Sequence, residues 1–326
     1  MGTPDLRVLM VGAILAAGPL SSCGTAAGSS QETTVQAPTQ RLQTLIALDR
    51  RVAEVAFNLA LANVELCSNV ARRAGWLLHA ASQYSADLRP EAERLYGLDG
   101  ALPGVSVVID GSPAAVAGLR VGDVITAVDD VPMEAARDQT RANYDDLARN
   151  LDILDAAMAG ADPVRLTVMR QGTTLTTELT PVLTCPYETQ VDSSPDIRAR
   201  ADGRRIFISS AFAAYADTAD ALAFVLGHEL AHNILGHPAQ TRGLNLAPWR
   251  IEQSENAADR VGLFLAARAG YDIRVVPDFL RRLGQDHWQL RYPQWGHASA
   301  PARARALEDV VAEIESLRAA DRPLTP

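Results

Sequence analysis

Apolar residues recur at helical spacing in several parts of the chain. Between residues 42 and 66 they return every three or four positions while Arg and Glu occupy the other faces, which predicts a long amphipathic helix. A continuous apolar run over residues 221–235 predicts a buried helix, and amphipathic patterns around 263–266, 271–283 and 301–317 predict three more. The second half of the chain is therefore expected to be mainly helical.

Between residues 97 and 183 the pattern changes to one typical of β-strands. A β-branched run at 105–109 is followed by a turn, a short alanine-rich helix and a second strand. After a helical insertion near 133–159, two further strands are joined by Gln171-Gly172, which predicts a hairpin. The expected fold class is α+β: a mainly helical domain with a small sheet, into which a β-rich domain is inserted.

The start of the chain has the pattern of an export signal. An apolar stretch over residues 8–20 is too short to span a bilayer. It ends in Leu20-Ser21-Ser22-Cys23, which resembles a bacterial lipobox and implies cleavage before Cys23 and lipidation of that residue. A plain cleaved signal is the alternative. Because Gly24 rather than Asp follows the cysteine, analogy with bacterial sorting favours the outer membrane, with the protein facing the periplasm and touching the membrane only through its anchor.

The cysteine count bears on disulfide bonding, and the net charge bears on the class of partner. If Cys23 is lipidated, Cys67 and Cys185 remain, and an exported chain permits them to form a disulfide. In the chain-entropy model, closing such a long loop with a disulfide stabilises the folded state by up to about 4–5 kcal/mol. Two unrelated buried thiols are the alternative. A net charge of −9 argues against a nucleic-acid partner.

The central candidate for chemistry is His228-Glu229-x-x-His232 within the predicted helix over 221–235. Two histidines four residues apart lie on one helix face, one turn apart, and can hold one zinc ion. Glu229 stands beside the first of them and can reach a water at the metal's open position. The alternative is two histidines on a partly exposed helix face that bond only to water or backbone.

A third zinc ligand is sought downstream, because a catalytic zinc takes three protein ligands. Glu255 and Asp259 are again four residues apart at the start of a helical pattern. Glu255 can ligate the zinc, and Asp259 can accept the free ring N–H of a zinc histidine. Alternatively, both acids only solvate a helix N-terminus, where negative charge is favoured. Glu252 is the fallback ligand.

The run from Leu222 to His232, followed by Glu255-x-x-Ala258-Asp259, resembles the zinc metallopeptidases of the HtpX, BepA and CAAX prenyl protease type. The resemblance implies that His228, His232 and Glu255 bind zinc and that Glu229 is the catalytic base. Because the chain lacks the membrane-spanning helices of HtpX and the prenyl proteases, it is most similar to the soluble, periplasmic BepA-like branch.

Two further segments share that resemblance. Residues 201–209 are similar to the strand before the family's zinc helix, whose edge is expected to hold substrate in extended form. Residues 295–303 are similar to the family's Thr-His-Pro-Ser…Arg segment, with Gly and Ala replacing Thr and Pro. This implies that His297 is a fourth zinc ligand in a latent state or an oxyanion helper, and that Arg303 supports the site. A structural histidine before a helix is the alternative.

The β-rich segment has a resemblance of its own. Gly-Ser-Pro-Ala-x-x-Ala-Gly-Leu-x-x-Gly-Asp, at residues 111–123, is similar to PDZ domains of bacterial proteases, which bind extended peptides or chain ends at a sheet edge. The matching loop is expected near Gly100, Gly104 and Val105. The alternative is a PDZ fold whose groove is covered and which only positions the peptidase.

These observations predict five segments: a signal peptide at residues 1–22, a flexible tether at 23–40, N-terminal helices at 41–96 that pack on the peptidase, a PDZ-like domain at 97–183 and the metallopeptidase domain at 184–326. The expected function is that of a lipid-anchored, zinc-dependent endopeptidase of the bacterial envelope that cleaves unfolded or misassembled proteins in extended form. Two alternatives remain: a quality-control adaptor or chaperone with a latent zinc site, and a peptidase that acts on a single partner.

Overall fold

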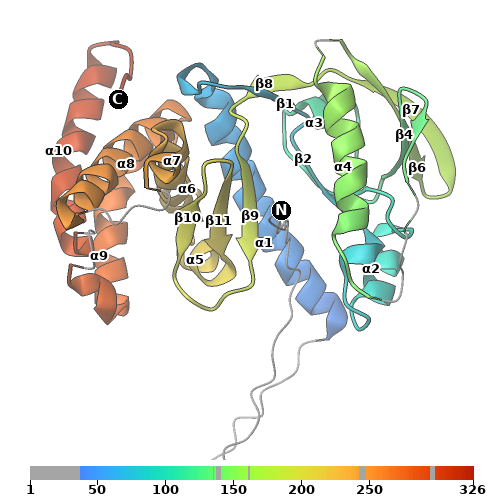
Figure 1. The fold of residues 1–326 in the computed structure, drawn as a ribbon, viewed down its shortest axis with the longest axis horizontal. Helices are drawn as coiled ribbons and strands as arrows, with labels where there is room; N and C mark the ends of the chain where they lie inside the picture. The colour runs from blue at the N-terminus through green and yellow to red at the C-terminus, as the bar shows by residue number, and fades with distance from the viewer. Residues whose placement is uncertain (1–36, 135, 137–140, 161, 242–246, 294–297) are drawn as a thin grey trace, which may run out of the picture.

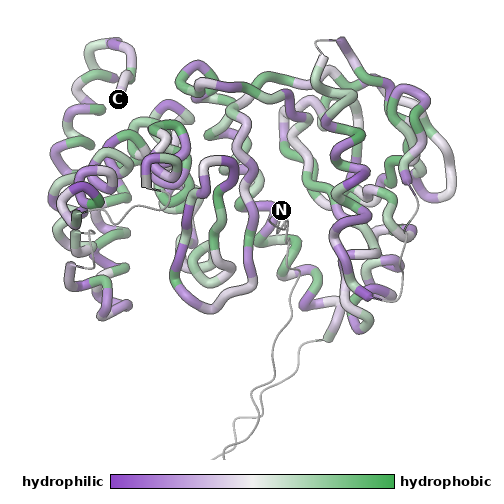
Figure 2. The backbone as a smooth tube through the Cα atoms, viewed as in Figure 1, coloured by the Kyte–Doolittle hydropathy of each residue, from purple (hydrophilic) through white to green (hydrophobic). Residues whose placement is uncertain are grey.

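The computed structural model describes residues 37–134, 136, 141–160, 162–241, 247–293 and 298–326. Within them the chain forms two parts on either side of a long helix, α1 (Pro38–Ala62), as Figure 1 shows. Hydrophobic and hydrophilic residues are interspersed along α1 (Figure 2), as expected for an amphipathic helix. The expected signal peptide, Cys23 and most of the tether lie outside the described residues.

The C-terminal part is mainly helical, as the sequence predicts. It contains α5 (Ser210–Tyr215), α6 (Ala219–Ile234), α7 (His237–Thr241), α8 (Pro248–Arg268), η3 (Ile273–Val275), α9 (Val276–Asp286), η4 (Trp288–Arg291) and α10 (Ala300–Ala319). Ser209, Thr218 and Ser299 each begin a helix by accepting a hydrogen bond from a backbone N–H three residues on. The apolar faces of these helices and one face of α1 form a common core. Of the helices in the described ranges, none combines the length and apolarity needed to cross a bilayer.

A small sheet lies against these helices. Its strands are β9 (Glu188–Asp192), β10 (Ala199–Ala201) and β11 (Arg205–Ser209), in the order β10-β11-β9. The middle strand β11 pairs antiparallel with β10 and parallel with β9. Strand β10 is therefore an edge strand, and both β10 and β11 contact α6.

The second part is built on a six-stranded antiparallel sheet. It contains β2 (Trp76–His79), β3 (Gly104–Val108), β4 (Val124–Val128), β5 (Val131–Pro132), β6 (Val164–Arg170) and β7 (Thr173–Leu179), with η2 (Ala81–Gln83), α2 (Arg89–Tyr96), α3 (Pro113–Val116) and α4 (Asp145–Met158). Gln171 and Gly172, both with positive φ, form the two-residue turn between β6 and β7, so the predicted hairpin is confirmed.

This sheet begins earlier in the chain than the boundary expected at residue 97. Strand β2 pairs antiparallel with β3, although the sequence places it among the N-terminal helices. Four residues carry too short a pattern to be recognised as a strand without the partner that satisfies their backbone groups. The inserted part thus lies between β1 (Ala71–Arg73) and β8 (Val182–Thr184), which pair with each other as the chain leaves and re-enters the helical part.

A disulfide closes the insertion at this crossing point. Cys67, just after η1 (Val64–Leu66), is bonded to Cys185, just after β8, at a sequence separation of 118. Cys185 is fully buried against the core that α1 shares with the helical part. The bond therefore links the end of α1 to the start of the peptidase-like segment. It is the disulfide that the cysteine count made possible.

The peptide-binding loop predicted near Gly100, Gly104 and Val105 is not at a free sheet edge. Gly104 begins β3, which pairs with β2 on one side and β4 on the other. The Val105 N–H donates to the Asp123 carbonyl at 2.7 Å, and the Gly100 carbonyl accepts from the Ser82 N–H at 2.8 Å. The backbone groups expected to meet a peptide are thus hydrogen-bonded within the fold, and β2 is the edge strand on this side of the sheet.

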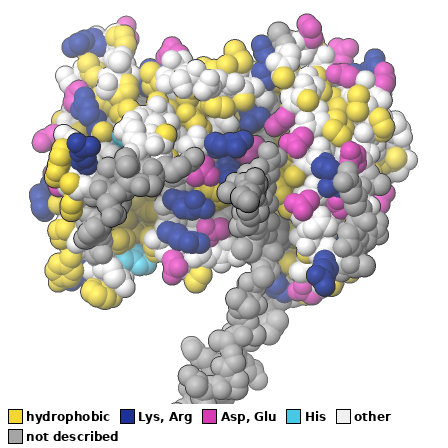
Figure 3. All heavy atoms as spheres, viewed as in Figure 1, with side chains coloured by type: hydrophobic (Ala, Val, Ile, Leu, Met, Phe, Trp, Pro, Cys, Tyr) yellow, Lys and Arg dark blue, Asp and Glu magenta, His cyan; other side chains and the backbone are white. Residues whose placement is uncertain are grey.

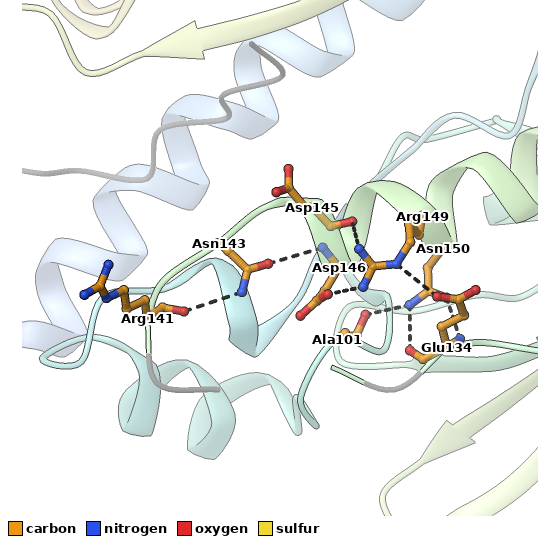
Figure 4. A network of polar contacts seen from close by, with 8 residues as sticks. All are labelled: Ala101, Glu134, Arg141, Asn143, Asp145, Asp146, Arg149 and Asn150. Atoms are coloured by element: carbon orange, nitrogen blue, oxygen red, sulfur yellow. Dashed lines mark hydrogen bonds and ion pairs between the residues drawn. The ribbon is translucent and has the colours of Figure 1, made fainter. Parts of the chain in front are cut away.

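Helix α4 is fixed to the rest of this part by polar contacts that Figure 4 shows. The buried side chain of Asn150 donates to the carbonyls of Ala101 and Glu134 at 2.9 and 3.0 Å and accepts from the Glu134 N–H at 2.7 Å. Arg149 pairs with the buried Asp146 and with Glu134. These contacts hold α4 in place beside the sheet, so the insertion is part of the packed fold.

Candidate metal centre

Helix α6 carries the two central histidines with their rings on one side. It is buried along most of its length, and the hydroxyl of Thr218 caps its first turn by accepting from the Ala221 N–H at 3.1 Å. His228 and His232 lie one turn apart, with ring centroids separated by 4.7 Å. Because most residues of the helix are buried, the two imidazoles and Glu229 are held on a tightly packed element.

Helix α8 crosses α6 at two glycines. A Cβ added to Gly227 would lie 2.7 Å from the Gly262 carbonyl oxygen, and one added to Gly262 would lie 2.6 Å from the His228 nitrogen. The two backbones are therefore in direct contact at this point, which only glycine at both positions permits. Glu255 and Asp259 precede Gly262 by seven and three residues, so the same face of α8 presents them to the histidines.

Three ligand atoms converge as a result. The Nε2 atoms of His228 and His232 are 3.1 Å apart, and the two carboxylate oxygens of Glu255 lie 3.3 Å from the first and 3.4 Å from the second. These residues form a group whose ligand atoms all lie within 4.8 Å of one another, so they could hold a metal ion. Glu252, the fallback ligand, is exposed and is not part of that group.

Asp259 lies directly behind His228. Its carboxylate accepts from His228 Nδ1 at 2.9 Å and from Arg303 Nε and Nη2 at 2.8 and 2.5 Å. Burial alone raises the pKa of Asp259, but the Arg303 guanidinium and His228 outweigh it and hold the pKa well below its ordinary value. The structure thus brings together Asp259 and Arg303, both singled out in the sequence, in one chain of contacts that fixes the His228 ring.

The charges around His228 favour a cation. Burial alone lowers the pKa of the imidazole, but hydrogen bonds to Asp259 and Glu255 reverse that effect and raise the pKa to about 10. The same two carboxylates that retain a proton on this ring would attract a metal cation to Nε2. The donor set therefore fits a divalent ion.

Glu229 is buried beside the histidines and lines the same cleft as the three ligand atoms. Burial raises the pKa of its carboxyl above the ordinary value, while the charges of His228 and His232 act in the opposite direction. A carboxylate with a raised pKa next to a metal site is suited to accept a proton and release it again.

The cleft at the metal centre has a volume of about 730 Å³. Residues of β10 and its flanks, 197–202, form one wall, and Phe279, Leu280, Leu283 and Leu290 contribute an apolar wall opposite. Figure 3 shows arginine side chains over the small sheet beside a hollow with apolar side chains in it, and Arg198 and Arg200 are among the lining residues. The cleft therefore combines an exposed strand edge with an apolar surface.

Two contributors were not singled out as functional from the sequence. His237 lies five residues after His232 in the sequence, and its Nδ1 lies 3.0 Å from Nδ1 of His232. Asn233 is buried, donates to the Arg205 carbonyl at 3.2 Å and accepts from the Gly203 N–H at 2.7 Å, which links the end of α6 to the β10–β11 turn. A polar residue inside an apolar helix is a sequence signal for Asn233. His297 lies outside the described residues.

Two segments of the chain match models of known protein families. Residues 169–251 match the model of peptidase family M48, and residues 104–151 match that of a PDZ domain. The first match contains His228, Glu229 and His232 and ends before Glu255. Among solved structures, the HtrA3 PDZ domain bound to a phage-derived ligand (FGRWV) is 18% identical, covers 35% of this chain and 89% of that chain, and has a TM-score of 0.26. The search of curated proteins found no match. The chain thus carries a segment that matches the metallopeptidases of family M48 and a segment that matches PDZ domains.

Proposed function

We propose that the protein is a zinc-dependent endopeptidase, with His228, His232 and Glu255 as the zinc ligands. The observation that carries the proposal is the spacing of the three ligand atoms, 3.1–3.4 Å. Ligands at about 2.0–2.1 Å in tetrahedral directions are separated by about 3.3 Å, so the three donors match three corners of a zinc tetrahedron. Two imidazoles and one carboxylate would supply the three protein ligands that a catalytic zinc takes.

A bound zinc ion would polarise the scissile carbonyl and lower the pKa of the attacking water. The chain's own part in the reaction is proton transfer by Glu229. Its carboxylate takes the proton of the attacking water and later gives it to the nitrogen of the departing amine. Asp259 and Arg303 keep the His228 ring oriented throughout, because Asp259 accepts the Nδ1 proton and is itself held by two hydrogen bonds from Arg303.

The cleft favours a substrate in extended form. Strand β10 pairs only with β11 among the described strands, so its outer edge can add a substrate strand beside the metal centre. The apolar wall opposite suits hydrophobic side chains, which unfolded or misassembled proteins expose and folded ones bury. These features support proteins with exposed extended segments as the substrate class.

The PDZ domain is proposed to position the peptidase rather than to offer an open groove. The space beside β2 and α4 is about 220 Å³ and is also lined by α1 and β9 of the helical part. Phe57 of α1 reaches Gly75 at the start of β2, where an added Cβ would lie 3.0 Å from its ring. Because small-molecule sites themselves occupy about 300–1,000 Å³, a peptide would enter only if α1 and the PDZ domain separated.

We also propose that the protein acts in the bacterial envelope on a lipid anchor at Cys23. The support is the lipobox-like segment before Cys23 and the Cys67–Cys185 disulfide, since disulfides persist in exported proteins. An outer-membrane anchor would leave the cleft free to meet unfolded periplasmic proteins. The adaptor or chaperone function is the second candidate; the match to PDZ domains supports it, and it would require α1 and the PDZ domain to separate so that a peptide could enter.

Replacement of Glu229 tests the proposal. Glu229→Gln should retain one zinc per chain and lose cleavage of unfolded casein by at least about 10²-fold, because only the proton transfer is removed. Zinc content by mass spectrometry of metals and gel assays of casein provide the two readouts. Retained cleavage would refute the assignment of Glu229. Complementation of a deletion strain by the same variant would favour the adaptor function.

A further inference from the structure

His237 reaches the metal centre through a sharp turn at the end of α6. The helix ends at Ile234, and Gly236, with φ of +71°, reverses the chain so that α7 begins at His237. The ring of His237 then packs edge-on against that of His232, with centroids 4.9 Å apart and planes inclined by 73°. The two Nδ1 atoms are 3.0 Å apart, which is hydrogen-bond distance.

Only one of these two nitrogens can carry the shared proton, and the position of the His232 ring decides which. Its Nε2 faces Nε2 of His228 and a carboxylate oxygen of Glu255, at 3.1 and 3.4 Å. A ligand nitrogen must offer its lone pair, so the proton of a neutral His232 lies on Nδ1. His232 therefore donates, and Nδ1 of His237 accepts.

The Nδ1 atoms of the two proposed zinc ligands His228 and His232 thus have different hydrogen-bond partners. Nδ1 of His228 bonds to the carboxylate of Asp259, whose charge is balanced by Arg303. Nδ1 of His232 bonds to an uncharged imidazole instead. Glu255 then remains the only carboxylate whose oxygens face both histidine Nε2 atoms among the described residues. A neutral acceptor behind His232 orients the ring without adding a further negative charge to the site.

We propose that His237 is a positioning residue that fixes the tautomer and the orientation of His232 by accepting its Nδ1 proton. This inference rests on the metal centre proposed above. Groups that orient a metal-binding histidine from behind commonly change metal affinity by about 10- to 100-fold when removed. His237 acts through His232 and is not among the three residues whose ligand atoms converge.

Zinc affinity measured by competition with a chromogenic chelator tests the role. His237→Ala should weaken zinc binding by about 10- to 100-fold. His237→Asn should restore most of the affinity, because its amide oxygen can replace Nδ1 as the acceptor. His287→Ala serves as the matched control: His287 packs on Tyr215, outside the cleft, and its loss should leave zinc affinity unchanged.

A second readout examines the His232 ring directly. In the zinc-bound wild type, ¹⁵N NMR of the histidine rings should show the His232 proton on Nδ1, in slow exchange, and that resonance should shift in His237→Asn. Wild-type affinity in His237→Ala, or an unprotonated Nδ1 on His232, would overturn the inference while leaving the peptidase proposal intact. If the wild type itself holds no zinc at His228, the metal centre fails and this inference fails with it.

Discussion

At the scale of single residues, a line of contacts from Arg303 through Asp259 to His228 is the most consequential. Asp259 is 4% exposed, and its two oxygens take three hydrogen bonds from these two partners. A buried carboxylate is tolerated only when its charge is compensated, so Arg303 supports the folded state as well as the metal site.

Arg303→Met should therefore destabilise the protein by about 3–5 kcal/mol, because it leaves the charge of Asp259 buried without its cation. Urea unfolding monitored by circular dichroism would measure the loss. The double variant Asp259→Asn/Arg303→Met is the matched control and should recover part of that stability, since no buried charge remains. Unchanged stability of Arg303→Met would show that Asp259 is neutralised in another way.

Burial of His79 makes the free energy of unfolding depend on pH. Its ring is buried against Tyr84 and Tyr96, its Nδ1 bonds to the Tyr84 hydroxyl at 2.7 Å, and burial lowers its pKa to about 3. The unfolded chain takes up a proton near pH 6.5 and the folded chain does not, so unfolding binds a proton between these values. The contribution of His79 to the free energy of unfolding is therefore complete above about pH 6.5. It falls by up to about 1.4 kcal/mol per pH unit as the pH is lowered toward 3.

The comparison of wild type with His79→Gln should isolate this effect, because acid loss of metal is common to both proteins. The free energy of unfolding of the wild type should fall more steeply between pH 6.5 and pH 4 than that of the variant. Parallel curves for the two proteins would mean that His79 titrates normally in the folded state.

At the scale of elements, the contact between α6 and α8 determines whether the ligands meet. Gly227 and Gly262 bring the two backbones together, and Glu255 lies two turns before that contact on α8. A ligand contributed by a second helix is only as well placed as the crossing of the two helices. Small residues at the crossing point are thus part of the metal site, although they touch no ligand atom.

Gly262→Ala should push the helices apart, since the new Cβ would lie 2.6 Å from the His228 nitrogen and 2.8 Å from its Cα. Overpacking of this kind costs about 1–3 kcal/mol, and zinc affinity should fall with it because Glu255 moves away. Gly160→Ala, where no heavy atom lies within 4 Å of an added Cβ, is the control in the same thermal unfolding and chelator assays. Normal zinc affinity in Gly262→Ala would contradict the role of the crossing.

The sequence predicted elements well where their pattern was long or their motif specific. The helical C-terminal half and the His228–Glu229–His232 arrangement follow from periodicity and spacing along single helices. Strand β2 and the contact of His237 with His232 could not be predicted in this way, because each depends on a partner that comes close only in the folded chain. That partner is β3 for the strand, and the turn at Gly236 brings the two histidines together. Whether the predicted peptide-binding loop near Gly104 lies at a free edge also depends on pairing, and in the folded chain β2 pairs with β3 there, as in the alternative of a covered groove.

At the scale of the whole molecule, α1 and the disulfide join the PDZ domain to the peptidase. Val52, Val55 and Leu59 of α1 belong to the core of the helical part, while Leu42 packs with Tyr84 in a separate cluster. The Cys67–Cys185 bond closes the whole insertion at its base. The PDZ domain is thereby attached both by packing and by a covalent link.

Removal of that link should lower stability without abolishing the fold of the cleft. The double variant Cys67→Ser/Cys185→Ser is expected to lose up to about 4–5 kcal/mol, because its unfolded chain regains the freedom of a loop with 118 residues of separation. Wild type and variant are compared by urea unfolding, with the reduced wild type as a second reference. Equal stability of oxidised and reduced wild type would contradict this expectation.

The central claim is that one zinc ion is held by His228, His232 and Glu255. Anomalous diffraction collected on both sides of the zinc absorption edge, from crystals of the zinc-loaded protein, tests it most directly. The account predicts one strong difference peak about 2.0–2.1 Å from Nε2 of both histidines and from a Glu255 oxygen. A peak elsewhere, or a zinc at the two histidines with Glu255 turned away and no other acid in its place, would contradict it.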